Sequence, residues 1–303
     1  MKKTLIIHFK VSKNDPIIAR NPFWMKDEAW KEKRNEVIPA MTPAKLKAIY
    51  PLIIDGTKNL VNFIKREIDK NSRHAFDSRD ISARYTCDSI TSCTFGADAK
   101  SFTSDDPFFF RKGRQLLRGM ADSMQSYIPK KMLPPDIEKF FIEIAKEAIK
   151  CRIESKIQQD DFLAHTISIK EKKGMDDLDA AAHCVTLFLD GYETTSVTLH
   201  HAFYEIGKNP KVQKKLRREI LENLDTDDGL SYDKLLELPY LNQVFYETLR
   251  LHPPLLLTTR VCSEDVEFKD FQGRKMTMKK NSSIWIPIHS IQRDQGFLQI
   301  SCQ

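Results

Sequence analysis

The chain of 303 residues is long enough to bury a large core, as one large domain or two ordinary ones. Hydrophobic residues make up 41% of it and charged residues 30%, a globular composition that argues against a disordered chain. The 48 Lys and Arg against 42 Asp and Glu give a net charge of +6, which suits an acidic partner or an anionic membrane surface but is too small to indicate nucleic-acid binding.

The cysteines and the apolar runs further limit the class of protein to which the chain can belong. Six cysteines lie along the chain without a C-x-x-C pair, so neither a zinc site nor a disulfide framework is indicated. No apolar run approaches the ~20 residues that a membrane-spanning helix needs. The apolar stretch within residues 1–9 is too short for a signal peptide. Membrane attachment is therefore expected only from sequence outside this chain or from a surface patch.

Apolar residues at three- and four-residue spacing predict helices along most of the chain, and glycine is scarce at 10 residues. In chain order, the first predicted helices cover residues 27–37, stopped by Pro39; 45–69, with a break near Pro51; 80–95, ended by Gly96; 108–124; and 135–155.

The longest predicted helix covers residues 176–208. Asn209 and Pro210 then start a helix over 210–224, and Pro239 starts another that ends at His252-Pro253-Pro254. Only after these prolines, over 261–271 and 283–288, do short alternating stretches predict strands. The expected fold class is mainly α, with a small sheet packed beside the helices.

A polar interruption lies inside the helix predicted over 176–208. Residues 184–189 are apolar on nearly every side, and Asp190-Gly191-Tyr192-Glu193-Thr194-Thr195 follows. Glycine costs a helix interior ~1 kcal/mol relative to alanine, and a threonine hydroxyl can bond back to the carbonyl one turn earlier. The interruption favours a groove with polar groups aimed into it, a local conflict typical of functional sites. The alternative is that the helix ends near Gly191 and that Thr194 or Thr195 caps another.

Two further motifs place an arginine one helical turn from a possible partner. Glu247 and Arg250 share a helix face and can form a bidentate pair, although such pairs are usually solvated and worth at most ~0.5 kcal/mol. This is the only E-x-x-R in the chain, and its apolar surroundings favour a structural role. Trp30 and Arg34, four residues apart, present two N–H donors on one face, where they could meet the carboxylates of a ligand. Surface cation–π packing is the alternative.

In order and content, these segments resemble the cytochrome P-450 family, and the resemblance is closest to its insect microsomal members. Nearly the whole chain from Asn21 to Asp294 takes part, and five ordered segments are far more specific than any one of them. The matching segments are WKEKR with a following PAMT within 30–42, DGYETT at 190–195, KNPKVQKKLRREI at 208–220, LPYLNQVFYETLRLHPP at 238–254 and WIPIHSIQRD at 285–294.

The resemblance implies haem b, an iron protoporphyrin, as cofactor. It implies that Thr194 helps to deliver protons for the activation of dioxygen, with Glu193 beside it in the relay and Gly191 making room over the haem. The residue types are consistent with this chemistry, because a thiolate ligand pushes electrons towards the iron while a hydrogen-bonded relay supplies protons from the other face.

The resemblance also implies how the haem is held. Trp30 and Arg34 match a pair that contacts one haem propionate, and Arg260 matches a second propionate contact. Glu247 and Arg250 match a buried pair that holds the haem-side core together, so their role would be structural.

Three departures from the family pattern limit these implications. The ligand loop, of the form F-x-x-G-x-R-x-C-x-G, is missing; Cys302 lacks Gly and Arg at the required spacing, so no metal ligand is predicted. The match stops after Asp294, which predicts a partial domain over 1–294 and a non-family tail over 295–303 from a wrong splice or frame. The N-terminal anchor region of the family is also expected to be absent. Asp190 stands where a small residue is common, and its charge would need a partner or water.

For the full-length parent, the resemblance implies a monooxygenase that inserts one oxygen atom into an apolar small molecule. Residues 108–124 and 255–258 would contact the substrate, NADPH–cytochrome P-450 reductase would supply electrons, and the protein would lie on the cytoplasmic face of the endoplasmic reticulum membrane. The chain as given would be inactive without the thiolate. Two alternatives stay open: a non-catalytic remnant that binds an apolar ligand or partner without turnover, and an all-helical interaction module unrelated to haem.

Overall fold

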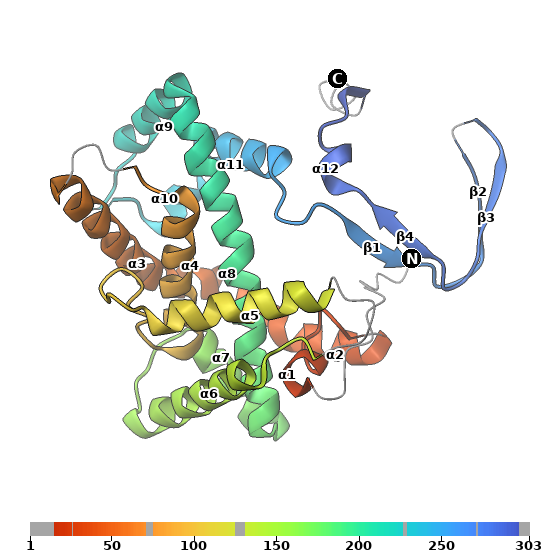
Figure 1. The fold of residues 1–303 in the computed structure, drawn as a ribbon, viewed down its shortest axis with the longest axis horizontal. Helices are drawn as coiled ribbons and strands as arrows, with labels where there is room; N and C mark the ends of the chain where they lie inside the picture. The colour runs from red at the N-terminus through yellow and green to blue at the C-terminus, as the bar shows by residue number, and fades with distance from the viewer. Residues whose placement is uncertain are drawn as a thin grey trace.

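The structure is a computed structural model that describes residues 15–25, 27–70, 75–124, 131–226, 229–270 and 272–296, with the backbone alone over 119–124. It is mainly helical, with two short two-stranded antiparallel ladders near its C-terminal end (Figure 1). The helices are α1 (Pro16–Ala19), α2 (Asp27–Val37), the 3-10 helix η1 (Ile38–Met41), α3 (Pro43–Lys70), α4 (Ser78–Phe95), α5 (Phe108–Met124), α6 (Pro135–Ser155), α7 (Phe162–Lys173), α8 (Asp177–Lys208), α9 (Pro210–Glu222), α10 (Tyr232–Leu236), α11 (Pro239–Leu251) and α12 (Ile288–Ile291).

Helix α8 is the axis around which the other helices pack. It begins at a capped end, where the Asp176 carboxylate accepts a hydrogen bond from the Asp179 backbone N–H at 2.6 Å, a standard way to satisfy a free donor at a helix start. Helix α4 makes the most extensive contact with it, and α6, α7 and α11 pack against other parts of its length (Figure 1). The predicted long helix is therefore confirmed as the central element.

An aromatic cluster fills the core between α4, α5, α6 and α8. Phe188 lies at its centre, with ring centroids 5.3 Å from Phe141, 5.8 Å from Phe109 and 6.0 Å from Phe95. Tyr192, one turn later on α8, stacks on Phe188 at 5.3 Å. Tilted and offset rings at these separations attract one another beyond the burial of their apolar surface. Four helices, α4, α5, α6 and α8, thus meet at this aromatic cluster.

The limits of several helices agree with their predictions. Helices α2, α5 and α6 have the predicted bounds, and α4 ends at Gly96, which adopts the left-handed conformation with φ of 60°. The break expected near Pro51 is wrong, because α3 continues through that residue. A proline inside a helix costs about 3 kcal/mol, so the packing of the apolar stripe of α3 on α4 must outweigh the lost hydrogen bond.

Helix α7 was not predicted, and a buried ion pair holds its first turn. Asp161 caps the helix by accepting from the Ala164 N–H at 2.8 Å. The same carboxylate accepts two hydrogen bonds from the Arg152 guanidinium of α6, at 3.1 and 2.8 Å. Both side chains are buried, and a paired, hydrogen-bonded charge is the form in which burial is tolerated. The cap therefore also joins α6 to α7.

The strands form two separate antiparallel ladders: β1 (Thr258–Val261) pairs with β4 (Ser283–Ile286), and β2 (Val266–Lys269) pairs with β3 (Lys275–Met278). The predicted small β region is confirmed, but its expected packing beside the helices is wrong. All four residues of β2 are exposed, and in Figure 1 the ladders extend away from the helices. The reason is that strand alternation specifies two faces, whereas covering one of them requires a second layer.

Among the described helices, none by itself is long and apolar enough to cross a membrane, while the bent pair of α2–η1 (Asp27–Met41) with α3 passes on length and composition only.

Candidate functional site

The polar stretch of α8 belongs to one continuous helix, so the alternative in which the helix ends near Gly191 is wrong. Every residue from Ala180 to Leu189 is buried, whereas Asp190, Thr194 and Thr195 are exposed. The Thr194 hydroxyl donates to the Asp190 carbonyl oxygen at 2.6 Å, as expected for a hydroxyl that bonds back one turn. The middle of a buried helix therefore opens one polar patch to solvent.

Gly191 allows α8 to approach α4 closely. A Cβ at this position would lie 2.5 Å from Cδ1 and 3.0 Å from Cγ1 of Ile90, so even alanine would force a side chain or a helix to move. The structure thus explains this glycine by the packing of two helices. Its expected place over a haem stays a prediction.

Asp190 starts the polar patch without a counterion. Although the residue is exposed, the protein packed around its carboxyl group raises its pKa to about 6. Burial is the cause, and in the described part of the chain no opposite charge offsets it. The sequence led us to expect a partner or water for this charge; no described side chain supplies the partner, and the exposed residue can reach water.

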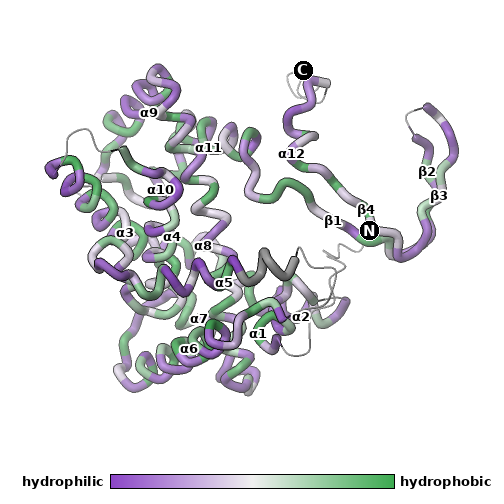
Figure 2. Tube along the Cα trace, viewed as in Figure 1, coloured by the Kyte–Doolittle hydropathy of each residue, from purple (hydrophilic) through white to green (hydrophobic). Residues whose placement is uncertain are grey.

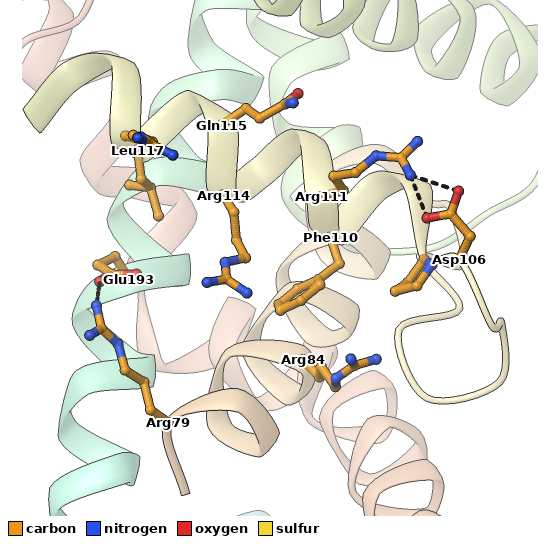
Figure 3. Close-up of a pocket in the computed structure, with 11 residues that line it drawn as sticks. Arg79, Arg84, Asp106, Phe110, Arg111, Arg114, Gln115, Leu117 and Glu193 are labelled. Atoms are coloured by element: carbon orange, nitrogen blue, oxygen red, sulfur yellow. Dashed lines mark hydrogen bonds and ion pairs between the residues drawn. The ribbon is translucent and has the colours of Figure 1, made fainter. Parts of the chain in front are cut away.

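Glu193 points from α8 into a cavity of about 630 Å³ that α4 and α5 also line (Figure 3). Its Oε1 lies 3.9 Å from a guanidinium nitrogen of Arg79, and both side chains are exposed to solvent, so the ion pair is loose. Glu193 and Thr194, although adjacent in sequence, face different surroundings, because Thr194 stays against its own helix on the exposed side.

Trp30 and Arg34 lie on one face of α2, as their spacing predicts. The Arg34 guanidinium carbon sits 5.3 Å from the centre of the Trp30 ring, a cation–π contact. Arg34 is exposed and Trp30 half-buried. Surface cation–π packing was the alternative interpretation of this pair. The contact leaves N–H donors of both side chains available to an anion on the exposed face.

A buried carboxylate fixes α2 against α8 and so positions this face. Glu36 accepts hydrogen bonds from Nε2 of His183 at 2.8 Å and from Nζ of Lys173 at 2.6 Å, and it pairs with Nζ of Lys33 at 3.1 Å. Burial by itself raises the pKa of Glu36, but these hydrogen bonds outweigh it and leave the pKa lowered. Burial lowers the pKa of His183. The carboxylate thereby ties three helices, α2, α7 and α8, to one point.

Arg260 lies on β1 and folds back on its own strand. Its guanidinium donates to the Thr258 hydroxyl at 3.0 Å and to the Thr259 carbonyl oxygen at 2.7 Å. No hydrogen bond or ion pair between described residues joins it to Trp30 or Arg34. The structure therefore brings together the two donors of α2, but the expected second propionate contact stays a prediction.

Glu247 and Arg250 form the bidentate pair that their spacing predicts, with N···O distances of 2.7 and 2.6 Å. Arg250 also donates to the Gln292 carbonyl oxygen at 2.9 Å, and its hydrogen bonds lower the pKa of Glu247. The expected burial of the pair is wrong, since 53% of the Glu247 side chain is exposed. Glu247 borders an open cavity of about 340 Å³ between α8, α9 and α11.

The described cysteines are all thiols that are buried or hydrogen-bonded to protein acceptors. Burial raises the pKa of Cys87, Cys93 and Cys184 to about 12, which keeps them as thiols. Cys151 is held as a thiol by hydrogen bonding to Glu147, and Cys262 donates its S–H to a backbone carbonyl oxygen. No described group of three His, Cys, Asp or Glu side chains could hold a metal ion. Cys302 lies outside the described residues, and its exclusion as a ligand stays a prediction.

Sequence reasoning missed the arginines that meet at the Glu193 cavity. Arg111, Arg114 and Arg118 follow one another at three- and four-residue spacing, which places them on one face of α5. That spacing was visible in the sequence. The arrival of Arg79 and Arg84 from α4 was not, because it depends on how α4 and α5 cross.

Comparison with known proteins agrees with the motifs. The family model described as cytochrome P-450 matches residues 5–297. Two fruit-fly (Drosophila melanogaster) proteins, described as probable cytochromes P-450 28d2 and 28d1, are each 30% identical over 305 residues, covering 96% of this chain and 60% of their own length. Cytochrome P-450 6A1 of Musca domestica is 28% identical, with 93% of this chain and 59% of its own length covered. The chain spans about 60% of the length of these curated relatives. By the match of nearly its whole length to the family model, the chain belongs to the cytochrome P-450 family.

Proposed function

We propose that this chain is the middle part of a haem-dependent monooxygenase that inserts one atom of O₂ into an apolar substrate. One observation carries the proposal beyond family membership: α8, buried from Ala180 to Leu189, opens a polar patch of Asp190, Thr194 and Thr195 without ending. An interruption of this kind in a continuous helix is typical of functional sites.

The residues that would hold haem b are Trp30, Arg34 and Arg260. The N–H donors of α2 are suited to a propionate, because an indole and a guanidinium both donate to carboxylate oxygens. Three consecutive exposed leucines, Leu255 to Leu257, supply apolar surface of the kind that a porphyrin face or an apolar substrate would cover. The haem, once bound, would supply the chemistry of dioxygen activation.

Thr194 and Glu193 would deliver protons for the reaction. The Thr194 hydroxyl, which donates to Asp190 in the structure, can turn to donate into the exposed patch instead. Glu193 lies on the next face of α8 and borders a solvent-filled cavity, from which it can take up a proton. Glu193 and Thr194, on neighbouring faces of α8, are therefore the two groups that we propose as proton carriers.

The cysteine environments favour a second candidate, a non-catalytic remnant that binds an apolar ligand or partner without turnover. All five described cysteines are held as thiols or engaged with protein acceptors. We propose that residues 1–294 form a partial family domain, that 295–303 are a non-family tail, and that this chain by itself lacks the thiolate ligand and is inactive.

The electron donor and location are proposed from the family alone. The parent protein would take electrons from NADPH–cytochrome P-450 reductase on the cytoplasmic face of the endoplasmic reticulum. The net charge of +6 is compatible with an acidic redox partner or an anionic membrane surface.

The test is to express residues 1–303, titrate haem by its change in absorbance, reduce the sample and record the carbon monoxide difference spectrum. We expect saturable haem binding that weakens about tenfold in Arg34→Gln, since a hydrogen-bonded charge contributes about 1.5 kcal/mol. Arg218→Gln, an exposed arginine of α9, is the control with the same change of charge.

Each spectrum decides one part of the proposal. A thiolate-type band would exclude the remnant, while saturable binding without that band would support a haem protein that needs a ligand from elsewhere. If haem binds with equal affinity to Arg34→Gln and Arg218→Gln, the assignment of α2 is wrong. Absence of saturable binding would remove haem from the function of this chain.

A further inference from the structure

Five arginines line the cavity between α4, α5 and α8 that Glu193 borders. They are Arg79, Arg84, Arg111, Arg114 and Arg118, and among the described side chains two acidic ones, Asp106 and Glu193, share the lining. Like charges gathered around one cavity repel one another, and an anion among them relieves that repulsion, although solvent screens part of it because four of the arginines are exposed. The cavity therefore has an excess of positive charge facing a volume of about 630 Å³.

Two of these arginines are already committed to protein acceptors. Arg84 donates to Asp80 at 2.7 Å and to the Ser101 carbonyl oxygen at 2.5 Å. Arg111 pairs with both oxygens of Asp106, at 2.5 and 2.6 Å. These bonds hold the two guanidinium groups in place at the edge of the cavity, and each keeps N–H groups that do not take part in them.

Arg114 and Arg79 have much weaker attachments. Arg79 reaches Glu193 only at 3.9 Å, beyond hydrogen-bonding distance. Arg114 makes no hydrogen bond or ion pair with any described residue; its guanidinium lies over the Phe110 ring in a cation–π contact and is close enough to Tyr192 to influence its pKa. In Figure 3 the Arg114 guanidinium points into the space between Glu193 and Phe110. The Arg114 guanidinium, exposed at the cavity wall, therefore has N–H donors that no described side chain accepts.

Phe110 organises the cluster. Its ring is 5% exposed, and the guanidinium groups of Arg84 and Arg114 lie 5.1 and 5.7 Å from its centre. Contact with a buried ring limits the positions that an arginine head can take, which reduces the ordering needed when a ligand arrives. Two arginines from different helices are thus held near one another before any anion binds.

From this geometry we propose that the cavity binds a phosphate group, with Arg114 as its main ligand and with Arg79 and Arg84 completing the site. Planar guanidinium forks match the oxygens of a phosphate, and a doubly charged anion offsets the repulsion among several arginines better than a carboxylate does. The cavity is larger than one phosphate, and the Phe110 and Leu117 side chains supply apolar wall for the rest of a phosphate ester.

Glu193 has a definite part in this site. Its carboxylate competes with the phosphate for Arg79, so binding would draw Arg79 away from Glu193. The phosphate site does not depend on haem, so its test and the test of the proposed function can fail separately.

The experiment titrates the 303-residue chain with inorganic phosphate by calorimetry, with added chloride keeping the ionic strength constant. We expect saturable binding that Arg114→Gln weakens about tenfold and that Arg218→Gln leaves unchanged. Glu193→Gln should tighten binding about threefold, because it removes the competing carboxylate. Circular dichroism and a thermal melt check the fold, and Arg114→Lys, which keeps the charge but loses the fork, should bind with intermediate affinity.

A second arm separates the sources of the phosphate. Vesicles of phosphatidylcholine with phosphatidic acid, compared with phosphatidylcholine alone, report whether a lipid headgroup reaches the site. Retention that Arg114→Gln abolishes supports the site and assigns it to lipid, whereas phosphate binding without retention supports the site and assigns it to a soluble ester. No saturable phosphate binding, or equal affinities of the wild-type chain and Arg114→Gln, would overturn the proposal.

Discussion

The helical body around α8 and the C-terminal arm, residues 255–296, both contain hydrophobic residues but bury them differently. Both carry hydrophobic segments along their length (Figure 2). All buried residues of the main core lie between Ile17 and Tyr192, and none belongs to the arm. In the arm, Phe268 and Trp285 remain 42% and 66% exposed.

The difference shows what a hydrophobic pattern needs in order to stabilise a fold. Helices α4 and α8 each offer a face to the other, so their apolar residues leave water together. The strands of the arm pair only in twos, and an isolated two-stranded ladder is marginally stable in water. Alternation therefore predicted where the strands form but not whether anything covers them.

The largest expected effect compares one phenylalanine from each region. Phe188→Ala removes a fully buried ring from the centre of the aromatic cluster and should lower the free energy of unfolding by about 3–5 kcal/mol. Phe268→Ala in β2 should change it by less than ~0.5 kcal/mol, because this residue is exposed and belongs to no core cluster. Urea unfolding followed by circular dichroism measures both. Equal losses would mean that the arm is packed in solution.

The next prediction tests the approach of α8 to α4. Gly191→Ala should destabilise the body by about 1–3 kcal/mol, because its Cβ would overlap Ile90, although the helix preference of alanine recovers up to ~1 kcal/mol. Ile90→Ala removes the overlapping atoms, so in that background Gly191→Ala should be neutral or stabilising. A double-mutant cycle measures this coupling. Additive effects would show that the two residues do not meet.

Arg250 connects the two regions, since it joins Glu247 of α11 to the Gln292 carbonyl of the arm. Arg250→Gln should cost about 1–2 kcal/mol and should chiefly free the arm, because the pair is half-exposed and the helical body does not depend on it. Hydrogen exchange should accelerate in α12 more than in α4. Arg217→Gln on α9 is the matched control, and uniform acceleration through both regions would contradict a local tether.

The smallest predicted effect is a pH dependence at Asp190. Its folded-state pKa of about 6 lies above the ~3.9 of an unfolded aspartate, so stability falls as pH rises from about 4 to 6 and the penalty persists above that. Asp190→Asn should therefore be more stable than the wild-type chain at pH 7, by under about 1 kcal/mol because solvent screens an exposed group. The difference should vanish below pH 4. A difference that is constant with pH would rule out titration of this carboxyl.

Local signals accounted for most helices. Prolines and glycines fix backbone angles and hydrogen bonding within one turn, which is why the end of α4 at Gly96 was readable from the sequence. Helix α7 carried comparable signals in its Asp161 cap and its terminal Gly174. It was not predicted, because its apolar residues do not form a clear stripe along one face. The passage of α3 through Pro51 was not predictable, because it depends on packing against another helix.

For the candidate site, the sequence by itself determined the pairs that lie within one helical turn. Trp30 with Arg34, Glu247 with Arg250, and Thr194 with the Asp190 carbonyl follow from helix geometry alone.

Only the tertiary structure decided what surrounds those pairs. The exposure of Glu247, the contact of Gly191 with Ile90 and the meeting of arginines from α4 and α5 depend on the angle and distance at which helices cross. Those quantities follow from side-chain packing between segments far apart in the chain, and no local spacing encodes them.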